Sequence, residues 1–355
     1  MRIDSVDIGL NNKPYLIAEI SANHNGSLDK ALDLVRAAKT AGASAVKLQT
    51  YTADTLTIKS SRGDFRIKGG LWDGRTLYDL YEQAQTPWEW HRDLFQAAGE
   101  AGITIFSSPF DATAVDLLEE LETSAYKIAS FEIVDHELIR RAASTGKPMI
   151  ISTGLASLNE ITEAYELAVG SGAQDVALLH CLSSYPAPAS EYKLNSISEL
   201  RKIFGCEVGL SDHTVGNDIA IASVPLGASI FEKHFTWDAD GGGPDDSFSM
   251  DRIGLTDLRK SLDTAWASLG FDNFEVQPSE ASNIRFRRSL YFVDEIRSGE
   301  TITTSHIRAI RPGYGIPPKL IHELLGRPSP VNAKAGDRVT KEIYQSITGT
   351  KFPPS

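Results

Sequence analysis

The feature that most constrains the fold is a regular alternation of two kinds of segment between residue 15 and about residue 270. Short apolar runs rich in β-branched residues, typical of buried strands, alternate eight times with longer segments of helical periodicity. Eight such rounds in roughly 250 residues predict an α/β fold, the (β/α)₈ barrel. The strand-like runs are residues 15–20, 44–49, 103–108, 125–130, 148–153, 176–181, 206–211 and 229–235.

A doubly wound open sheet is the competing fold. It would need fewer strands and usually has a glycine-rich, phosphate-binding turn after the first strand. This chain has AEISANHNG at that place instead. We therefore expect the closed barrel, with its first helix capped by Ser27 and ended by Gly42.

Two segments break the alternation. Residues 51–91 form a long insertion after the second strand, rich in Trp and Tyr, and long loops of this kind build substrate pockets in barrels. From about residue 275, short strand-like pieces separated by Gly and Pro predict a small, irregular β-rich domain. We predict a barrel domain over residues 1–275, a linker over 276–284 and a C-terminal domain over 285–355.

Composition argues against several classes of protein. In 355 residues there is no apolar run near the length that spans a bilayer, and the N-terminus does not read as a secretion signal, so we expect a cytoplasmic protein without membrane contact. The net charge of -12 and the lack of a basic cluster argue against a nucleic-acid partner. Cys181 and Cys206 are expected to be buried thiols in a reducing compartment.

Polar residues gather at the carboxyl ends of the predicted strands, where a barrel forms its active site. A buried lysine is costly unless it is paired or contacts an anion. Two lysines, a glutamate and several serines at one rim therefore predict a site for a charged substrate. The strand-end residues are Glu19, Lys47, Gln49, Ser108, Lys127, Ser130, Ser152, His180, Ser211, His213 and His234.

Several of these residues allow more than one interpretation. His213 and His234 close neighbouring strands and as a pair are candidates to bind one divalent metal such as Mn²⁺, although a single histidine there is better explained as a hydrogen-bonded rim residue. Lys47 and Lys127 fit an anion cradle or a Schiff-base nucleophile. Glu19 fits proton transfer, orientation of a substrate hydroxyl, or pairing with a lysine.

Nine blocks of sequence resemble the sialic acid synthase family, in that family's order. RRSLYFVDEIRSGETIT and IRPGYGIPP are similar to its C-terminal antifreeze-like (SAF) domain. The resemblance runs nearly end to end and implies a metal-dependent enzyme that condenses phosphoenolpyruvate with an amino sugar. The blocks are IAEISANHNG, AVKLQTY, FSSPFD, YKIASFE, ISTGLAS, LLHCLSSYP, GLSDHT, FEKHFT and GPDDSFSMD.

The same resemblance implies roles for individual residues. His213 and His234 would bind the metal, with Mn²⁺ expected first and Mg²⁺ or Co²⁺ as alternatives. In the family, the small domain of one subunit caps the barrel of its partner, which implies a domain-swapped homodimer with Arg311 at the neighbouring site. Phosphoenolpyruvate would be held by Lys47, Lys127, Ser130, Ser152 and Ser211. The sugar would face Glu19, Gln49, Tyr185 and Asp245. The substrate-binding set is completed by Ser108, Phe110, Glu132 and Ser183.

Within the family, details of the sequence favour a deoxy, diacetamido hexose as the sugar. The chain has SANHNG where neuraminate-forming members usually have GVNHNG, and Ser183 where they commonly carry Asn. The Trp and Tyr residues of the insertion suit methyl and acetamido groups. A neuraminate- or legionaminate-forming enzyme is the alternative within the family, and a Schiff-base lysine aldolase is the alternative of another class. A metal-dependent hydrolase or a binding module on an inert barrel explains the rim less well.

Overall fold

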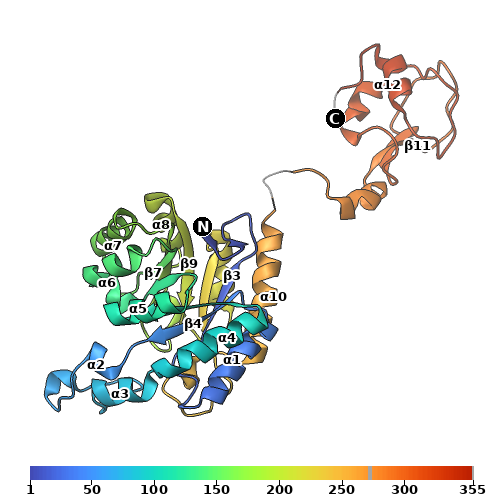
Figure 1. Cartoon of the computed structure of the whole chain (residues 1–355). Coiled ribbons are helices and arrows are strands. Elements are labelled where there is room, and N and C mark those ends of the chain that lie inside the picture. Colours follow the sequence, from blue (N-terminus) through green and yellow to red (C-terminus); the bar gives the residue numbers. More distant parts are fainter. Residues whose placement is uncertain (271–273, 354–355) are drawn as a thin grey trace. The chain divides into compact units, whose positions relative to one another are not determined.

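The structure is a computed structural model that describes residues 1–270 and 274–353. The chain divides into two compact units, the first over Met1–Gly270 and the second over the described residues that follow (Figure 1). Each unit has its own apolar core. The predicted domain ranges also included residues 271–273 and 354–355, which lie outside the described residues.

Eight parallel strands close into a barrel in the first unit, as the alternation predicted. Closure is made by β10 and β3, which pair from Ile230 with Tyr15 to His234 with Glu19, so the alternative of an open sheet is wrong. The strands are β3 (Tyr15–Glu19), β4 (Ala45–Thr50), β5 (Thr104–Pro109), β6 (Tyr126–Ile128), β7 (Met149–Ser152), β8 (Val176–Cys181), β9 (Glu207–Asp212) and β10 (Ile230–His234).

Helices between successive strands cover the outside of the barrel (Figure 1). The first helix has the predicted ends, because the Ser27 side chain accepts a hydrogen bond from the Lys30 amide and Gly42 adopts a left-handed φ of 90°. No helix in the described part of the chain is long and apolar enough to cross a membrane. The helices are α1 (Leu28–Ala41), α4 (His91–Ala101), α5 (Ala112–Glu120), α6 (His136–Ala143), α7 (Leu158–Gly170), α8 (Ser196–Phe204), α9 (Asp218–Ser223) and α10 (Arg252–Leu269), with short 3₁₀ turns η3 (Ser130–Val134), η4 (Ala189–Glu191), η5 (Val224–Leu226) and η6 (Asp246–Phe248).

The interior of the barrel is apolar at the amino ends of the strands. Side chains alternate along a strand, so every second residue points inward. A short hairpin of β1 (Arg2–Ile3) and β2 (Val6–Asp7) contributes Ile3 and Ile8 to the same cluster. Continuing the alternation toward the carboxyl ends brings the ionisable strand-end residues inside. The apolar inner layer consists of Tyr15, Ile17, Ala45, Phe106, Ala125, Ile150, Ala177, Leu179 and Ile230.

The insertion between β4 and α4 stands off from the ring of helices (Figure 1). An antiparallel bridge joins Arg66 to Thr76, so the chain between them turns back as a hairpin. Two backbone hydrogen bonds support this hairpin, from the Ile67 amide to the Arg75 carbonyl at 2.9 Å and from the Gly74 amide to the Ile67 carbonyl at 3.0 Å. The insertion also contains α2 (Ala53–Leu56), η1 (Gly63–Phe65), α3 (Leu77–Ala84) and η2 (Trp88–Trp90).

The C-terminal unit is small and mostly irregular among its described residues. Strands β11 (Ser289–Phe292) and β12 (Ile307–Ile310) pair antiparallel. Its short helices are η7 (Pro278–Phe286), η8 (Pro318–Leu320), α11 (Ile321–Leu324) and α12 (Lys341–Thr348). Its apolar core is built from Leu290, Phe292, Ile296, Ile302, Ile307, Ile316, Leu320, Leu324, Ala333, Val339 and Tyr344.

The close packing of the barrel predicts that Gly209 on β9 does not tolerate a side chain. A Cβ there would lie 2.1 Å from the Ile230 carbonyl oxygen and 2.7 Å from the Leu179 side chain. We expect Gly209→Ala to lower the free energy of unfolding by about 1–3 kcal/mol, because backbone must shift to admit the methyl group. Calorimetric melting measures this loss.

The matched control is Gly99→Ala on α4, where a Cβ meets no described atom within 4 Å. Replacing a glycine by alanine in a helix stabilises it by about 0.5–1 kcal/mol, so this variant should melt slightly above the wild type. Equal melting temperatures for Gly209→Ala and the wild type would contradict the packing described here.

Candidate active site

The barrel opens at the carboxyl ends of its strands into a cleft of about 460 Å³. One side of the cleft is formed by the insertion and the other by residues at or just after the strand ends. The predicted site residues that line the cleft directly are Gln49, Phe110, Glu132, Ser183, Tyr185, His234 and Asp245. The remaining predicted residues of the barrel lie around and beneath them.

Lys47 is held by two buried carboxylates. It forms an ion pair with Glu19, and its Nζ lies 3.9 Å from Glu232 Oε2. Burial lowers the pKa of Lys47, but the carboxylates of Glu19 and Glu232 raise it overall. Lys47 Nζ also donates to Ser108 Oγ at 3.2 Å, and Gln49 Nε2 donates to Glu19 Oε1 at 3.3 Å. Lys47 therefore stays a cation.

Lys127 shares the same buried carboxylate. Its Nζ donates to Ser152 Oγ at 2.6 Å and lies 4.0 Å from Glu232 Oε1, which also accepts from Ser211 Oγ at 3.0 Å. Although burial raises the pKa of Glu232, Lys127 and Lys47 bring it below its usual value. Burial lowers the pKa of Lys127. Three strands thus bring the amino groups of two lysines and the Ser211 hydroxyl to one carboxylate, with Ser152 beside Lys127, an arrangement that can also receive the oxygens of an anion.

His213 and His234 face each other, with ring centroids 5.4 Å apart. His213 Nδ1 lies 2.9 Å from the Leu182 carbonyl, which can only accept, so Nδ1 carries the hydrogen and Nε2 is left for another partner. Burial lowers the pKa of His213, but the Cys181 thiol beside it raises the pKa overall. Burial and the neighbouring His213 hold the pKa of His234 well below its usual value, so His234 is neutral.

The two imidazoles fit a divalent cation that takes its other ligands from outside the protein. His234 Nδ1 is buried and has no hydrogen-bond partner among the described residues. The same part of the chain contains no cluster of three or more His, Cys, Asp or Glu side chains able to hold a metal. Two imidazoles that each offer one ring nitrogen leave several positions of an ion such as Mn²⁺ open for substrate oxygens.

Aromatic and acidic side chains complete the cleft. The Tyr185 ring lies 4.4 Å from the His213 ring and 5.1 Å from Phe248. Glu132 Oε2 is buried without a hydrogen-bond partner in the described structure, and burial raises the pKa of Glu132 to about 7. Asp245 accepts a hydrogen bond from Ser21. The cleft therefore offers a carboxyl group that can carry a proton at neutral pH.

The remaining predicted residues are placed as follows. Phe110 packs edge-on against Tyr51, with ring centroids 5.1 Å apart. Ser130 Oγ accepts from the Gly154 amide at 3.2 Å. Arg311 is exposed and directly follows β12 in the C-terminal unit, which is described by itself.

The prediction that His180 points into the barrel is wrong. Its Nε2 is bonded to the Tyr192 carbonyl on the helix side of β8. Because side chains alternate along the strand, Leu179 points inward and the residue that follows it points outward. Cys181 takes the inner position, with its Sγ 3.9 Å from His213 Nδ1. Cys181 and Cys206 are both free thiols, as predicted, although only Cys181 is fully buried.

Glu232 is the central residue that sequence reasoning missed. It is 5% exposed and contacts both lysines of the cluster. The available signal was its position two residues before His234 on the same strand, which the alternation also places inside the barrel. Tyr51, Tyr81 and Phe248 line the cleft as well, and loop residues of this kind have no comparable periodicity.

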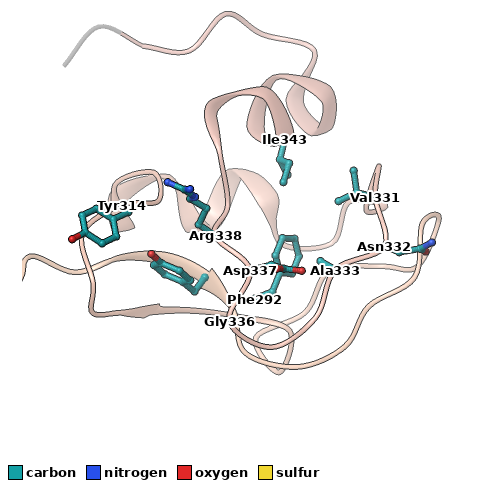
Figure 2. A pocket seen from close by; sticks show the side chains of 10 residues that line it. Phe292, Tyr314, Val331, Asn332, Ala333, Gly336, Asp337, Arg338 and Ile343 are labelled. Carbon is teal, nitrogen blue, oxygen red and sulfur yellow. The ribbon is translucent and has the colours of Figure 1, made fainter. Parts of the chain in front are cut away.

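A second recess, of about 610 Å³, lies in the C-terminal unit (Figure 2). Its charged lining residues, Asp337 and Arg338, are both exposed to solvent. Among the described residues that line it, none is a buried carboxylate, lysine or histidine like those of the barrel cleft. We therefore place the chemistry in the barrel.

Comparison with known proteins identifies the family of the chain. The NeuB family matches residues 34–273. The chain is 41% identical to the pseudaminic acid synthase of Campylobacter jejuni serotype O:2, and the match covers 94% of this chain and 97% of that protein. It is 43% identical to the pseudaminic acid synthase of Helicobacter pylori, and that match covers 88% of this chain and 93% of the relative. The fold is similar to the crystal structure of N-acetylneuraminic acid synthetase from Leptospira borgpetersenii in complex with citrate, with a TM-score of 0.71 and 30% sequence identity. This match covers 80% of the present chain and 94% of the synthetase chain. The chain belongs to the NeuB family, the sialic acid synthase family that its motifs resemble.

Proposed function

We propose that the chain is a pseudaminic acid synthase, which condenses phosphoenolpyruvate with 2,4-diacetamido-2,4,6-trideoxy-L-altrose and releases phosphate. The observation that carries the proposal is the buried Lys47–Glu232–Lys127 cluster beside the imidazoles of His213 and His234. The higher identity to two pseudaminic acid synthases than to the N-acetylneuraminic acid synthetase supports this branch of the family.

Phosphoenolpyruvate suits the lysine cluster. It carries a phosphate and a carboxylate on a small carbon frame, and the two ammonium groups are already ordered by Glu232, so little reorganisation is needed on binding. Gly154 keeps the backbone close to this side of the site, because a Cβ there would lie 2.3 Å from Ser183 Oγ and 2.7 Å from Ser130 Oγ. We assign the anion to Lys47 and Lys127 with the hydroxyls of Ser108, Ser130, Ser152 and Ser211.

We propose that His213 and His234 hold one divalent cation, Mn²⁺ first and Mg²⁺ or Co²⁺ as alternatives. When bound, such a cation polarises the aldehyde oxygen of the open-chain sugar. The Leu182 carbonyl fixes the tautomer of His213 and the Tyr185 ring packs against it, so this imidazole is oriented before substrates arrive. Holding both substrates in one cleft supplies the proximity that a reaction between two small molecules needs.

The condensation of the two substrates needs a proton donor, a role that Glu132 fits. C3 of phosphoenolpyruvate attacks the aldehyde carbon, water adds at C2, and the C–O bond to phosphate breaks. The aldehyde oxygen gains a proton when the C–C bond forms. Glu132 lines the cleft and its pKa is raised to about 7, so it fits the donor of that proton. A Schiff-base aldolase is less well supported at Lys47, because carboxylates hold Lys47 as a cation; Lys127, whose pKa burial lowers, is the nucleophile that this alternative would use.

The proposed reaction is tested by phosphate release from phosphoenolpyruvate with three sugars. These are the diacetamido trideoxy altrose, its manno epimer and N-acetylmannosamine. After treatment with chelator, we expect release only when a divalent metal is added back, and fastest with the altrose. Equal or faster turnover of N-acetylmannosamine would overturn the branch assignment, and full activity without metal would remove the histidine pair from the mechanism.

The role of Glu132 predicts a dependence on pH. A carboxyl group with a pKa of about 7 is protonated below that pH and loses its proton above it, so we expect kcat/KM to fall as pH rises through about 7. Glu132→Gln should remove this limb and lower the rate roughly 100-fold. Glu137→Gln, at a side chain that is 87% exposed, is the control. A Glu132→Gln profile identical to the wild type would rule out this role.

We assign the C-terminal unit as a SAF domain that covers the barrel of a second copy of the chain. Apolar side chains three residues beyond four strand ends are 58–77% exposed at the mouth of the barrel, which is typical of a surface that another chain covers. They are Phe131, Leu155, Val215 and Trp237. A cytoplasmic location, where free thiols persist, belongs to the same proposal.

A mixing experiment tests whether Arg311 acts in the partner's site. His213→Ala and Arg311→Ala should each be inactive as homodimers. After the two are unfolded and refolded together, half of the dimers are mixed, and each mixed dimer has one intact site if Arg311 acts across the interface. We therefore expect about a quarter of wild-type activity to return, as two-fold symmetry requires. No recovery in dimers shown to be mixed would place Arg311 in its own chain's site or outside the reaction.

A further inference from the structure

We propose that Trp72 is a specificity-determining residue, which fastens the insertion across the cleft and thereby closes an apolar wall over the sugar. The proposal rests on the function proposed above and adds how the site distinguishes one amino sugar from another. It starts from the unequal chemistry of the two sides of the cleft. The side made by the insertion consists of Leu56, Ile67, Trp72, Leu77, Leu80 and Tyr81.

These wall residues make the insertion side of the cleft mostly apolar. On the side of the strand ends and the loops after them, Gln49, Glu132 and Asp245 offer oxygen and nitrogen atoms to hydroxyl groups, beside the rings of Phe110, Phe131 and Phe248. A sugar that lies between the two sides is best matched when it has hydroxyl groups on one side and methyl groups on the other. A hydroxyl turned toward the leucine and isoleucine side chains of this wall would lose its hydrogen bonds to water without gaining a partner.

Trp72 occupies a special place in this wall. It lies near the tip of the hairpin formed by residues 66–76, and its Nε1 donates to the Pro244 carbonyl at 3.1 Å. Its ring centroid is 6.0 Å from that of Tyr185. One side chain thus joins the insertion to two loops on the far side of the cleft, the loop after β10 and the loop after β8.

The loop after β10 is held independently of Trp72. Asp246 is buried and its Oδ2 accepts from the Asn25 side chain and from the Gly243 amide, both at 2.8 Å. A Cβ on Gly243 would lie 1.8 Å from Asn25 Oδ1, so the loop also packs tightly there. The Pro244 carbonyl is therefore a fixed anchor. Losing the Trp72 hydrogen bond should free the hairpin and leave Asp245 in place.

The sugar class that fits this wall is a hexose that presents methyl groups in place of free hydroxyl groups. A 2,4-diacetamido-2,4,6-trideoxy hexose has two acetamido methyl groups and a methyl at C6. A 2-acetamido hexose keeps hydroxyl groups at C4 and C6. Apolar pockets discriminate by roughly 10- to 200-fold per methylene-sized difference, so the wall is able to set the preference between these two sugars.

The experiment compares kcat/KM for these two sugars in three proteins, with phosphoenolpyruvate saturating. In Trp72→Ala, which loses both the ring and the N–H group, we expect the preference for the trideoxy sugar to fall by roughly 10- to 100-fold. In Trp72→Phe, which keeps an aromatic ring and loses one hydrogen bond, it should fall by about fivefold. The KM for phosphoenolpyruvate should not change in either variant.

Trp266→Phe is the matched control, because its Nε1 donates to the Leu10 carbonyl at 2.9 Å on the outside of the barrel. It should keep the wild-type preference. An unchanged preference in Trp72→Ala, or an equal loss on both sugars, would overturn the proposal. If the wild type itself does not use the trideoxy sugar, the proposed function fails instead, so the two failures are distinguishable. Trp72→Phe provides the test if Trp72→Ala does not fold.

Discussion

Closure of the barrel is the constraint on which the site depends. When β10 pairs with β3, the first and last strands become neighbours, and residues more than 200 positions apart in the sequence meet at one rim. Glu19 and His234 lie directly opposite each other in this pairing. The buried charges need the same closure, since an isolated buried ion costs several kcal/mol, and each lysine finds Glu232 only because the strands surround one interior.

Much of this architecture could be predicted from the sequence because it follows from periodicity. The eight strands were found from short apolar runs separated by helical segments, and Ser27 and Gly42 end the first helix as their side-chain chemistry requires. The strand-end residues of the site, such as Lys47, Lys127 and His234, were predicted from one rule, that polar groups at strand ends meet at the mouth of a barrel. That rule needs only sequence positions. Loop residues such as Tyr185 and Asp245 were predicted only from the resemblance to the family.

The sequence-based predictions failed where the position of a residue along the chain does not give the direction of its side chain. His180 was expected inside because it is polar and near a strand end, but the alternation along β8 gives the inner position to Cys181. The same alternation, applied backward from His234, would have found Glu232. The contact between Trp72 and Pro244 could not be predicted in this way, because it joins two loops whose paths follow from tertiary packing and not from a local period.

We propose that two imidazoles on neighbouring strand ends share one cation. This sharing is tested by titrating the chelator-treated protein with Mn²⁺ and following electron paramagnetic resonance in the presence of phosphoenolpyruvate. We expect one bound ion per chain, lost in both His213→Ala and His234→Ala and kept in His180→Ala, whose ring is turned to the Tyr192 carbonyl. Wild-type Mn²⁺ binding in His234→Ala would contradict it.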